Sequence, residues 1–263
     1  MQVLKFTLSG NTAIFKRPDV NSNVYFTYSH IHKVALLGIL GSICGFGGYT
    51  QQKIHNNSCK TKNKKSAETI QPMDYPEFYE KLKNLKIAIK PSKPIYSKKI
   101  QKFNNSVGYA SKEDGGNLIV TEQWLENPSW EIYILLGSDV ANEIKNRILE
   151  NNFVYIPYLG KNDHFANIQN AEVFNAEKVS SNNIKVNSMI ENSKIQEFYD
   201  EEYDEDDDDD EIEDIFYRES LPTALEKVAN QYILSKLVYT NKLLKLSDTE
   251  NIFECQKENI YFL

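Results

Sequence analysis

The chain has 263 residues, of which 41% are hydrophobic and 25% charged. This is an ordinary globular composition, with length for one large domain or two small ones, and it argues against a fibrous protein. The three cysteines, Cys44, Cys59 and Cys255, form neither a disulfide framework nor a zinc pattern, which indicates a reducing compartment. Residues 1–9 lack the pattern of a signal peptide, and the apolar stretch 34–48 is shorter than the about 20 residues that span a bilayer. We expect a cytoplasmic protein that makes no membrane contact.

The net charge of −7 is unevenly distributed along the chain. Residues 197–214 contain 14 acidic residues and no basic one, so the rest of the chain carries +7. Residues 53–102 contain 13 lysines and 4 acidic residues, a net charge of +9. A basic body with an acidic insert is compatible with binding to nucleic acid, although any single lysine can be an ordinary solvated residue.

The first third of the chain predicts a strand, a helix and two polar segments. Residues 4–8 alternate apolar and polar side chains, as a half-buried strand does. Residues 10–28 form a polar connection, and Ser29 can cap a helix that ends near residue 44, before paired glycines. Residues 50–72 are rich in Lys and Asn and predict a mobile loop.

The middle of the chain predicts two strands around a hairpin, and then a helix and a strand. Prolines stop the first strand, the sequence Asp114-Gly115-Gly116 is a turn signal, and Ser138 can cap the helix. The expected elements, in chain order, are a short helix from about residue 75, a strand at 85–89, a hairpin within 95–128, a strand at 130–136, a helix from 138 to about 151, and a strand at 153–158.

Without the insertions, the order of elements is β, α, β, β, α, β. This order predicts an α+β protein with a ferredoxin-like domain, in which helices cover one face of an antiparallel sheet. We expect part of residues 222–246 to be helical and residues 260–263 to form a closing strand. The predicted divisions are 1–165 for this domain, 166–196 for short strands or a linker, 197–214 for a disordered acidic tract, and 215–263 for a C-terminal segment of helix and strand that packs on the body.

Six blocks of the sequence form a pattern in chain order. The blocks are Phe-Lys-Arg-Pro-Asp-Val-Asn at 15–21, Thr-Tyr-Ser-His-Ile-His-Lys at 27–33, a glycine-punctuated helix that ends in Gly47-Gly48-Tyr49, Phe-Asn-Asn-Ser-Val-Gly-Tyr at 103–109, Glu-Gln-Trp-Leu at 122–125, and Tyr-Ile-Pro-Tyr-Leu-Gly-Lys-Asn-Asp-His-Phe at 155–165. Together they resemble the CRISPR-associated protein 5 family, and most of all its type I-B branch. The resemblance covers roughly residues 1–170 and is weaker from residue 221 onward. The acidic tract matches no pattern of that family.

The resemblance implies a non-catalytic subunit of Cascade, a type I CRISPR interference complex of antiviral defence. Such subunits have a ferredoxin-like RNA-recognition domain and bind the 5′ handle of the guide RNA (crRNA). A hairpin thumb, here at about residues 97–127, presses on the guide. The implied partners are the crRNA, the Cascade backbone subunit and the large subunit, with target DNA contacted only through the complex. No cofactor is implied.

Handle binding needs cations for phosphates, and polar or aromatic groups for bases. Pro18 can stiffen a turn that presents two neighbouring cations, although an ordinary basic loop is an equal alternative. Two histidines near the helix start can contact phosphate or can serve capping and the core, and they fall short of a metal ligand set. Turn construction is the alternative for the polar residues of the hairpin and of the 160–164 loop. The predicted RNA-binding residues are Lys16, Arg17, Asn21, Tyr28, His30, His32, Lys33, Asn104, Asn105, Ser106, Tyr109, Lys112, Lys161, Asn162 and His164.

Two other functions compete with this reading. One is a metal-independent endoribonuclease that processes precursor crRNA, as the type I-C branch of the family does, because His30, His32, Tyr28 and Lys33 offer acid–base groups. The other is a generic RNA-binding scaffold, which the absence of a Lys/Arg-Gly-Phe aromatic motif disfavours. Because the non-catalytic subunit remains the preferred interpretation over both alternatives, we expect no enzymatic activity.

Overall fold

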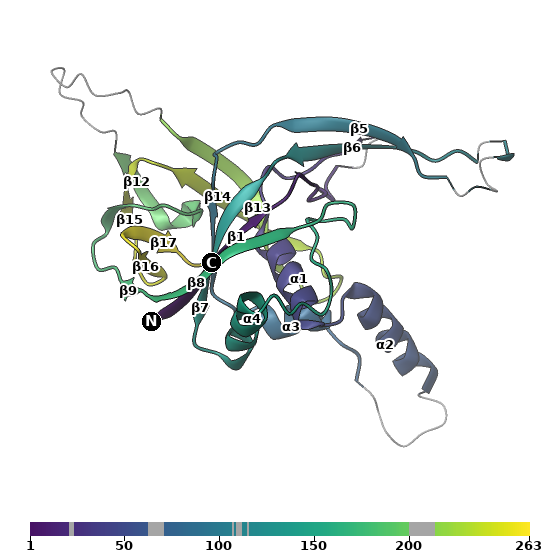
Figure 1. The fold of residues 1–263 in the computed structure, drawn as a ribbon, viewed down its shortest axis with the longest axis horizontal. Helices are drawn as coiled ribbons and strands as arrows, with labels where there is room; N and C mark the ends of the chain where they lie inside the picture. Colours follow the sequence, from purple (N-terminus) through teal and green to yellow (C-terminus); the bar gives the residue numbers. More distant parts are fainter. Residues whose placement is uncertain (21–23, 63–70, 107, 109–111, 115, 200–213) are drawn as a thin grey trace.

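A computed structural model gives the fold of the chain (Figure 1). It describes residues 1–263 except 21–23, 63–70, 107, 109–111, 115 and 200–213. Two predicted site residues, Asn21 and Tyr109, lie outside the described residues, and so does most of the acidic tract.

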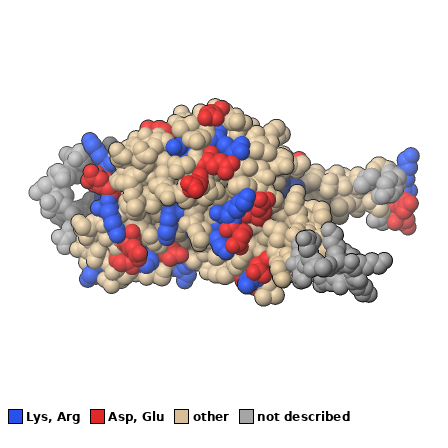
Figure 2. Space-filling model, turned by 90° about the horizontal axis from the view of Figure 1, so that it is seen from below, with Lys and Arg blue, Asp and Glu red and all other residues tan. Residues whose placement is uncertain are grey.

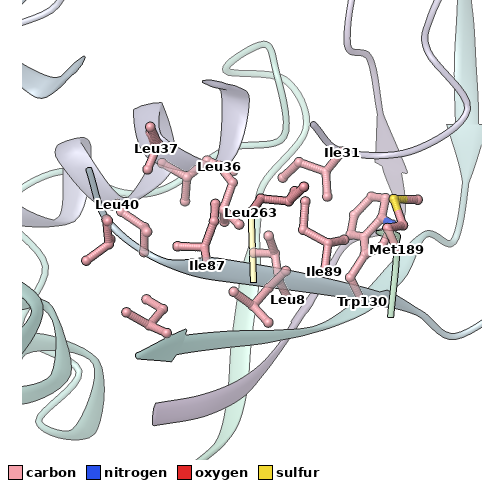
Figure 3. Close-up of a cluster of buried hydrophobic side chains, with 14 of the residues drawn as sticks. Leu8, Ile31, Leu36, Leu37, Leu40, Ile87, Ile89, Trp130, Met189 and Leu263 are labelled. Atoms are coloured by element: carbon pink, nitrogen blue, oxygen red, sulfur yellow. The ribbon is translucent and has the colours of Figure 1, made fainter. Parts of the chain in front are cut away.

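The central feature is a four-stranded antiparallel sheet in the order β4-β7-β1-β8. The side chains of Leu4, Phe6 and Leu8 alternate along β1 and are buried on the helix-covered face, as the sequence predicts. In Figure 3, Leu8 lies in one cluster with Leu36 and Leu40 of the helix above it. The strands are β1 (Gln2–Ser9), β4 (Ile87–Pro91), β7 (Ser129–Leu136) and β8 (Asn167–Asn175), and the helices are α1 (Lys33–Cys44), α3 (Glu77–Leu82) and α4 (Asp139–Leu149).

The opposite face of the sheet is partly covered by the end of the chain. Strands β16 (Ile252–Cys255), β17 (Glu258–Tyr261) and β9 (Glu177–Lys178) form a small sheet of their own. The side chains of Phe253 and Phe262 pack there against Val3 and Tyr133 of the central sheet. This face of the central sheet is therefore partly closed to solvent and to ligands.

The C-terminal region consists of strands, so the helix expected within residues 222–246 is wrong. Leu, Lys and Ala favour helix there, but the register of strand pairing decides the structure. Strands β13 (Phe216–Leu225) and β14 (Tyr232–Thr240) pair along their whole length. The other strands are β10 (Asn183–Lys185), β11 (Ile190–Glu191), β12 (Ile195–Tyr199) and β15 (Leu243–Leu246), with a 3-10 turn at Asn192–Lys194. The closing strand predicted at 260–263 is confirmed in part, because β17 begins at Glu258 and ends at Tyr261.

Capping residues determine where α1 and α4 begin. The predicted cap Ser138 is confirmed, because its side chain accepts from the Ala141 amide. The predicted cap Ser29 is wrong: His32 caps α1, and its Nδ1 accepts from the Ala35 amide at 3.1 Å. The helix ends at Gly45, whose φ of 80° is left-handed. Gly41 permits close packing, since a Cβ there would lie 2.5 Å from the Phe78 side chain.

Three further expectations differ from the structure. Residues 49–62 form the helix α2 (Tyr49–Lys62) where we expected a loop, because a polar helix offers no apolar period to read. Residues 153–158 form no strand: the Val154 and Tyr155 amides instead donate to the Ile43 and Ser42 carbonyls at the end of α1. Strand β8, rather than residues 153–158, is the fourth strand of the central sheet. The segment 197–199, expected to be disordered, belongs to β12.

A long hairpin extends away from the body, as the turn signals predict (Figure 1). Strand β5 (Lys98–Asn104) pairs with β6 (Ile119–Glu126) from Lys98–Leu125 out to Asn104–Ile119. Two short strands, β2 (Thr12–Ala13) and β3 (Val24–Tyr25), pair with β6 at the base of the hairpin.

Among the described helices, none is by itself long and apolar enough to cross a bilayer. Only α1 and the first part of α2, taken as a pair bent by 79°, reach the required length and composition.

Candidate nucleic-acid interface

A cleft of about 690 Å³ lies beside α1 and opens toward the base of the hairpin. Its floor is a strip of small side chains on α1, including Ala35 and Gly38. We name it the tyrosine cleft, because its walls carry Tyr49, Tyr155, Tyr158 and Tyr232. The first three of these tyrosines are 47%, 59% and 44% exposed. Exposed aromatic rings beside a hollow of this size are suited to stacking with unpaired bases.

Lys16 stands at the edge of this cleft. Residues 15–17 pair with residues 26–28 in an antiparallel bridge, so alternate side chains point to opposite sides. Phe15 is therefore buried, and Lys16 faces the cleft and solvent. The Lys16 Nζ lies 3.5 Å from the centre of the Tyr25 ring, which holds the cation in place. Within the described part of the chain, no carboxylate forms an ion pair with Lys16, so its charge is available to a phosphate.

Arg17 has a different environment from its neighbour. Its Nε and Nη2 donate to the two carboxylate oxygens of Asp19 at 3.2 and 2.7 Å. This pairing raises the pKa of Arg17 above its ordinary value and lowers that of Asp19. Arg17 also lies over the Tyr28 ring at 5.6 Å. The charge of Arg17 is thus already paired with Asp19. The structure therefore gives Lys16 and Arg17 different environments, although the sequence predicted the same role for both.

The predicted contacts at the start of α1 lie in the interior. Tyr28, His30 and His32 are 2%, 0% and 2% exposed. Burial lowers the pKa of His30 to about 4 and that of His32 to about 3, and it raises the pKa of Tyr28 to about 12. His30 bonds the Pro94 carbonyl and accepts from Trp130 Nε1. These side chains serve capping and the core, which was the alternative reading of the sequence.

Lys33 is also occupied within the fold. Its Nζ donates to the main-chain oxygen of Leu263 at 2.9 Å. Burial lowers the pKa of Lys33 to about 8. Lys33 therefore joins α1 to the last strand region and does not point into the tyrosine cleft.

Lys161 lines the cleft opposite Lys16 and is paired with a buried acid. Its Nζ donates to both oxygens of Glu122 at 2.9 and 3.1 Å, and Trp124 Nε1 donates to Oε2 of the same carboxylate at 2.8 Å. Glu122 is only 3% exposed, whereas Lys161 is 37% exposed at its side chain. Lys161 also lies 5.2 Å from the Phe103 ring. The group fastens the hairpin to the loop that carries Tyr155 and Tyr158.

His164 supports the same junction from inside and is not at the surface. Its Nδ1 bonds the Thr12 hydroxyl at 2.6 Å, and its ring meets Trp124 edge-on at 4.7 Å. Burial, followed by the nearby Lys161 charge, lowers its pKa. Its Nε2 has no hydrogen-bond partner among the described residues. The neighbouring Asn162 is exposed and points to solvent.

The described residues among the predicted hairpin contacts do not line the cleft. Asn104 accepts from the Ser106 amide, and the Ser106 hydroxyl accepts from Leu118, so these two side chains build the hairpin. Asn105 and Lys112 are exposed. The structure therefore does not bring the hairpin residues together with Lys16 and Lys161 in one site.

Charge alone does not mark the interface. On the face drawn in Figure 2, Lys and Arg alternate with Asp and Glu rather than forming one basic surface. The most informative residues were not among those predicted from the sequence. They are Glu122 and the exposed rings of Tyr25, Tyr49, Tyr155 and Tyr158. The block that contains Tyr155 and Tyr158 was visible, but its β-favouring composition suggested a strand.

Comparisons with known proteins agree on the fold. No protein-family profile matches the sequence, and no curated protein does. Among solved structures, a chain of a "CRISPR RNA-guided surveillance complex" matches with a TM-score of 0.51 and 10% identity, over 94% of this chain and 92% of that one. The chain therefore has the fold of a subunit from a CRISPR RNA-guided complex.

Two weaker similarities involve other CRISPR proteins. A chain of the type III-B Cmr-beta complex bound to cognate target RNA and AMPPnP matches with a TM-score of 0.49 and 9% identity, over 93% of this chain and 86% of that one. A CRISPR protein from Archaeoglobus fulgidus matches with a TM-score of 0.42 and 9% identity, over 99% and 98%.

Proposed function

We propose that this chain is the non-catalytic subunit of a type I CRISPR interference complex, of the I-B kind, that binds and caps the 5′ handle of the crRNA. The observation that carries the proposal is the tyrosine cleft, with Lys16 at its edge, on the fold of a chain from a CRISPR RNA-guided surveillance complex. No carboxylate of the described residues forms an ion pair with Lys16. Exposed tyrosines would stack with splayed handle bases, and Lys16 would contact a phosphate between them.

The architecture supports the same proposal. The sheet order β4-β7-β1-β8, built from β, α, β, β, α and β segments, supports the proposal of a ferredoxin-like RNA-recognition domain. In this proposal the β5–β6 hairpin is the thumb that presses on the guide. The contacts of Lys161 and Trp124 with Glu122 would set its angle to the body.

The proposal also assigns partners. In the cytoplasm the chain would bind the crRNA, the adjoining Cascade backbone subunit and the large subunit. It would meet target DNA only through the assembled complex. Because the sheet face is partly covered by β16 and β17, the RNA would use the cleft and the hairpin rather than that face.

We propose no catalytic role. The acid–base groups that an endoribonuclease would use, His30, His32 and Tyr28, are buried, and Lys33 is bonded to Leu263. Incubation of the purified chain with labelled repeat RNA, with and without a chelator, tests this point. We expect intact RNA in both reactions, and a discrete cut within the repeat would support the endoribonuclease instead.

Co-purification with the products of neighbouring genes tests the role itself. The bound RNA is sequenced from the complex that contains this chain and from a complex prepared without it. We expect guides that lose protection of their repeat-derived 5′ end when the chain is absent. Unchanged 5′ ends would contradict handle binding, and RNA unrelated to repeats would favour a generic scaffold.

A further inference from the structure

A second groove lies along α2, next to the first turn of this helix, which borders the tyrosine cleft. It has a volume of about 560 Å³ and lies between α2 and the turn that joins β13 to β14. We name it the α2 groove; it is lined on one side by Gln52, Lys53, Asn56 and Asn57, and on the other by Lys227 and Asn230.

The composition of α2 favours a polyanion. The helix contains Lys53, Lys60 and Lys62 and no acidic residue in 14 positions. Lys53 and Asn57 are separated by four positions, which places them along one side of the helix. This helix also carries the first lysines of the basic segment 53–102. Amides and ammonium groups in a row are the donors that proteins use for nucleic-acid backbones.

The groove is held open by contacts that leave its cations available. Asn56 exchanges two hydrogen bonds with the Met73 main chain, and Asn230 donates to the Asp74 carbonyl, so α2 and the turn are fixed to the same segment. Lys227 pairs with Asp74 at 3.1 Å, but both side chains are more than half exposed, so that ion pair is weak. Within the described part of the chain, no carboxylate pairs with Lys53.

The α2 groove continues the tyrosine cleft. The first turn of α2 contributes Tyr49 and Gln51 to the cleft, and the next turns contribute to the groove. Strand β14 likewise supplies Tyr232 to the cleft, and its preceding turn borders the groove. From Tyr49 to Asn57 the helix rises about 12 Å, a distance that a few nucleotides of an extended strand can bridge.

We propose that the α2 groove is a second site for single-stranded RNA, which holds the phosphates of a strand that leaves the tyrosine cleft across the first turn of α2. This inference rests on the proposed RNA-binding function. It assigns to Lys53 and Lys227 a role that nothing in the sequence motifs indicated.

The test compares the full chain with the variant Lys53→Ala/Lys227→Ala. The control variant Lys178→Ala/Lys257→Ala removes the same charge from exposed positions next to β9 and β17, on the far side of the body from α2 (Figure 1). Binding of a short labelled RNA of random sequence is measured at several salt concentrations, and the protected length is mapped with a nuclease. Thermal unfolding checks that each variant is folded.

We expect the groove variant to lower the log–log salt slope by about 1.4, or about 0.7 for each lost phosphate contact, and to shorten the protected RNA by a few nucleotides. The control should leave both unchanged.

A groove variant that matches the control, while Lys16→Ala still weakens binding, would overturn this inference and leave the proposed function standing. A chain that binds no RNA would overturn both. A polyglutamate peptide whose binding depends on Lys53 and Lys227, with RNA binding unaffected, would assign the groove to an acidic protein and overturn it as well.

Discussion

Lys16 and Arg17 show how two neighbouring cations acquire different roles. Lys16 is exposed at the edge of the tyrosine cleft, whereas Arg17 shares two hydrogen bonds with Asp19. A phosphate that approached Arg17 would have to compete with an existing carboxylate. The contribution of each cation to RNA binding should therefore be unequal.

The first prediction separates them. Lys16→Ala should reduce the log–log salt slope of RNA binding by about 0.7, because one phosphate contact is lost. Arg17→Ala should change the slope by much less. Fluorescence titration of each single variant against a random single strand gives both slopes. Equal losses in the two variants would mean that Asp19 does not occupy Arg17 when RNA is present.

The second prediction concerns acid stability. His30 and His32 have pKa values of about 4 and about 3 in the fold, whereas an unfolded histidine has about 6.5. Between these values the unfolded chain binds more protons, so stability is complete above about pH 6.5 and falls as the pH drops toward 4. By about pH 5 each histidine should cost roughly 2 kcal/mol.

Urea unfolding at neutral and mildly acid pH measures this loss. The variant His32→Asn keeps a side chain that can cap α1 but removes one titrating group. At about pH 5 it should lose roughly 2 kcal/mol less stability on acidification than the unmodified chain. An identical pH dependence in the two proteins would show that His32 is protonated without cost, and would contradict its buried neutral state.

At the scale of elements, the sequence predicts those that carry a strong local signal. Alternation identified β1, the cap at Ser138 identified α4, and Asp114-Gly115-Gly116 identified the hairpin. Prediction from the sequence failed where pairing between distant strands determines the structure. Residues 222–246 have helical composition but pair as β13, β14 and β15.

Two other segments were predicted wrongly, and each error has a local physical cause. Residues 153–158 have the composition of a strand, but two of their amides satisfy carbonyls at the end of α1. The polar helix α2 has no apolar face to reveal it. Because both of these segments contribute tyrosines to the tyrosine cleft, the site could not be assembled from the sequence even though its tyrosines were visible.

The third prediction tests the hairpin as an element. Replacing residues 104–109 by a Gly/Ser linker should leave a folded chain, because none of the described residues at the hairpin end belongs to the buried core clusters. The variant should assemble poorly with guide RNA and its partner subunits, which gel filtration of the co-expressed complex measures. Normal assembly and normal protection of the guide would show that the hairpin is not the thumb.

At the scale of the whole molecule, the composition predicts a basic body with an acidic insert, but the face drawn in Figure 2 shows no single basic surface. The acidic tract joins the end of β12 to the start of β13, and residues 200–213 lie outside the described residues. Its possible effects are repulsion of nucleic acid, competition with RNA for the basic surfaces, or solubility alone.

The fourth prediction distinguishes competition from the others. Deletion of residues 200–213 leaves β12 and β13 complete. If the tract competes with RNA, the deletion should tighten non-specific RNA binding at low salt and change little at high salt, because salt screens an intramolecular competitor. Equal affinity of the deleted and intact chains for a random single strand at low ionic strength would eliminate competition.

The central claim is that the tyrosine cleft holds the 5′ handle of a guide RNA. Ultraviolet cross-linking of the native complex, followed by identification of the linked peptide and nucleotide, measures this directly. The account predicts cross-links from Tyr155, Tyr158 or the Lys16–Tyr25 segment to repeat-derived nucleotides at the 5′ end. Cross-links confined to the β16–β17 face, or to the spacer and 3′ end of the guide, would contradict it.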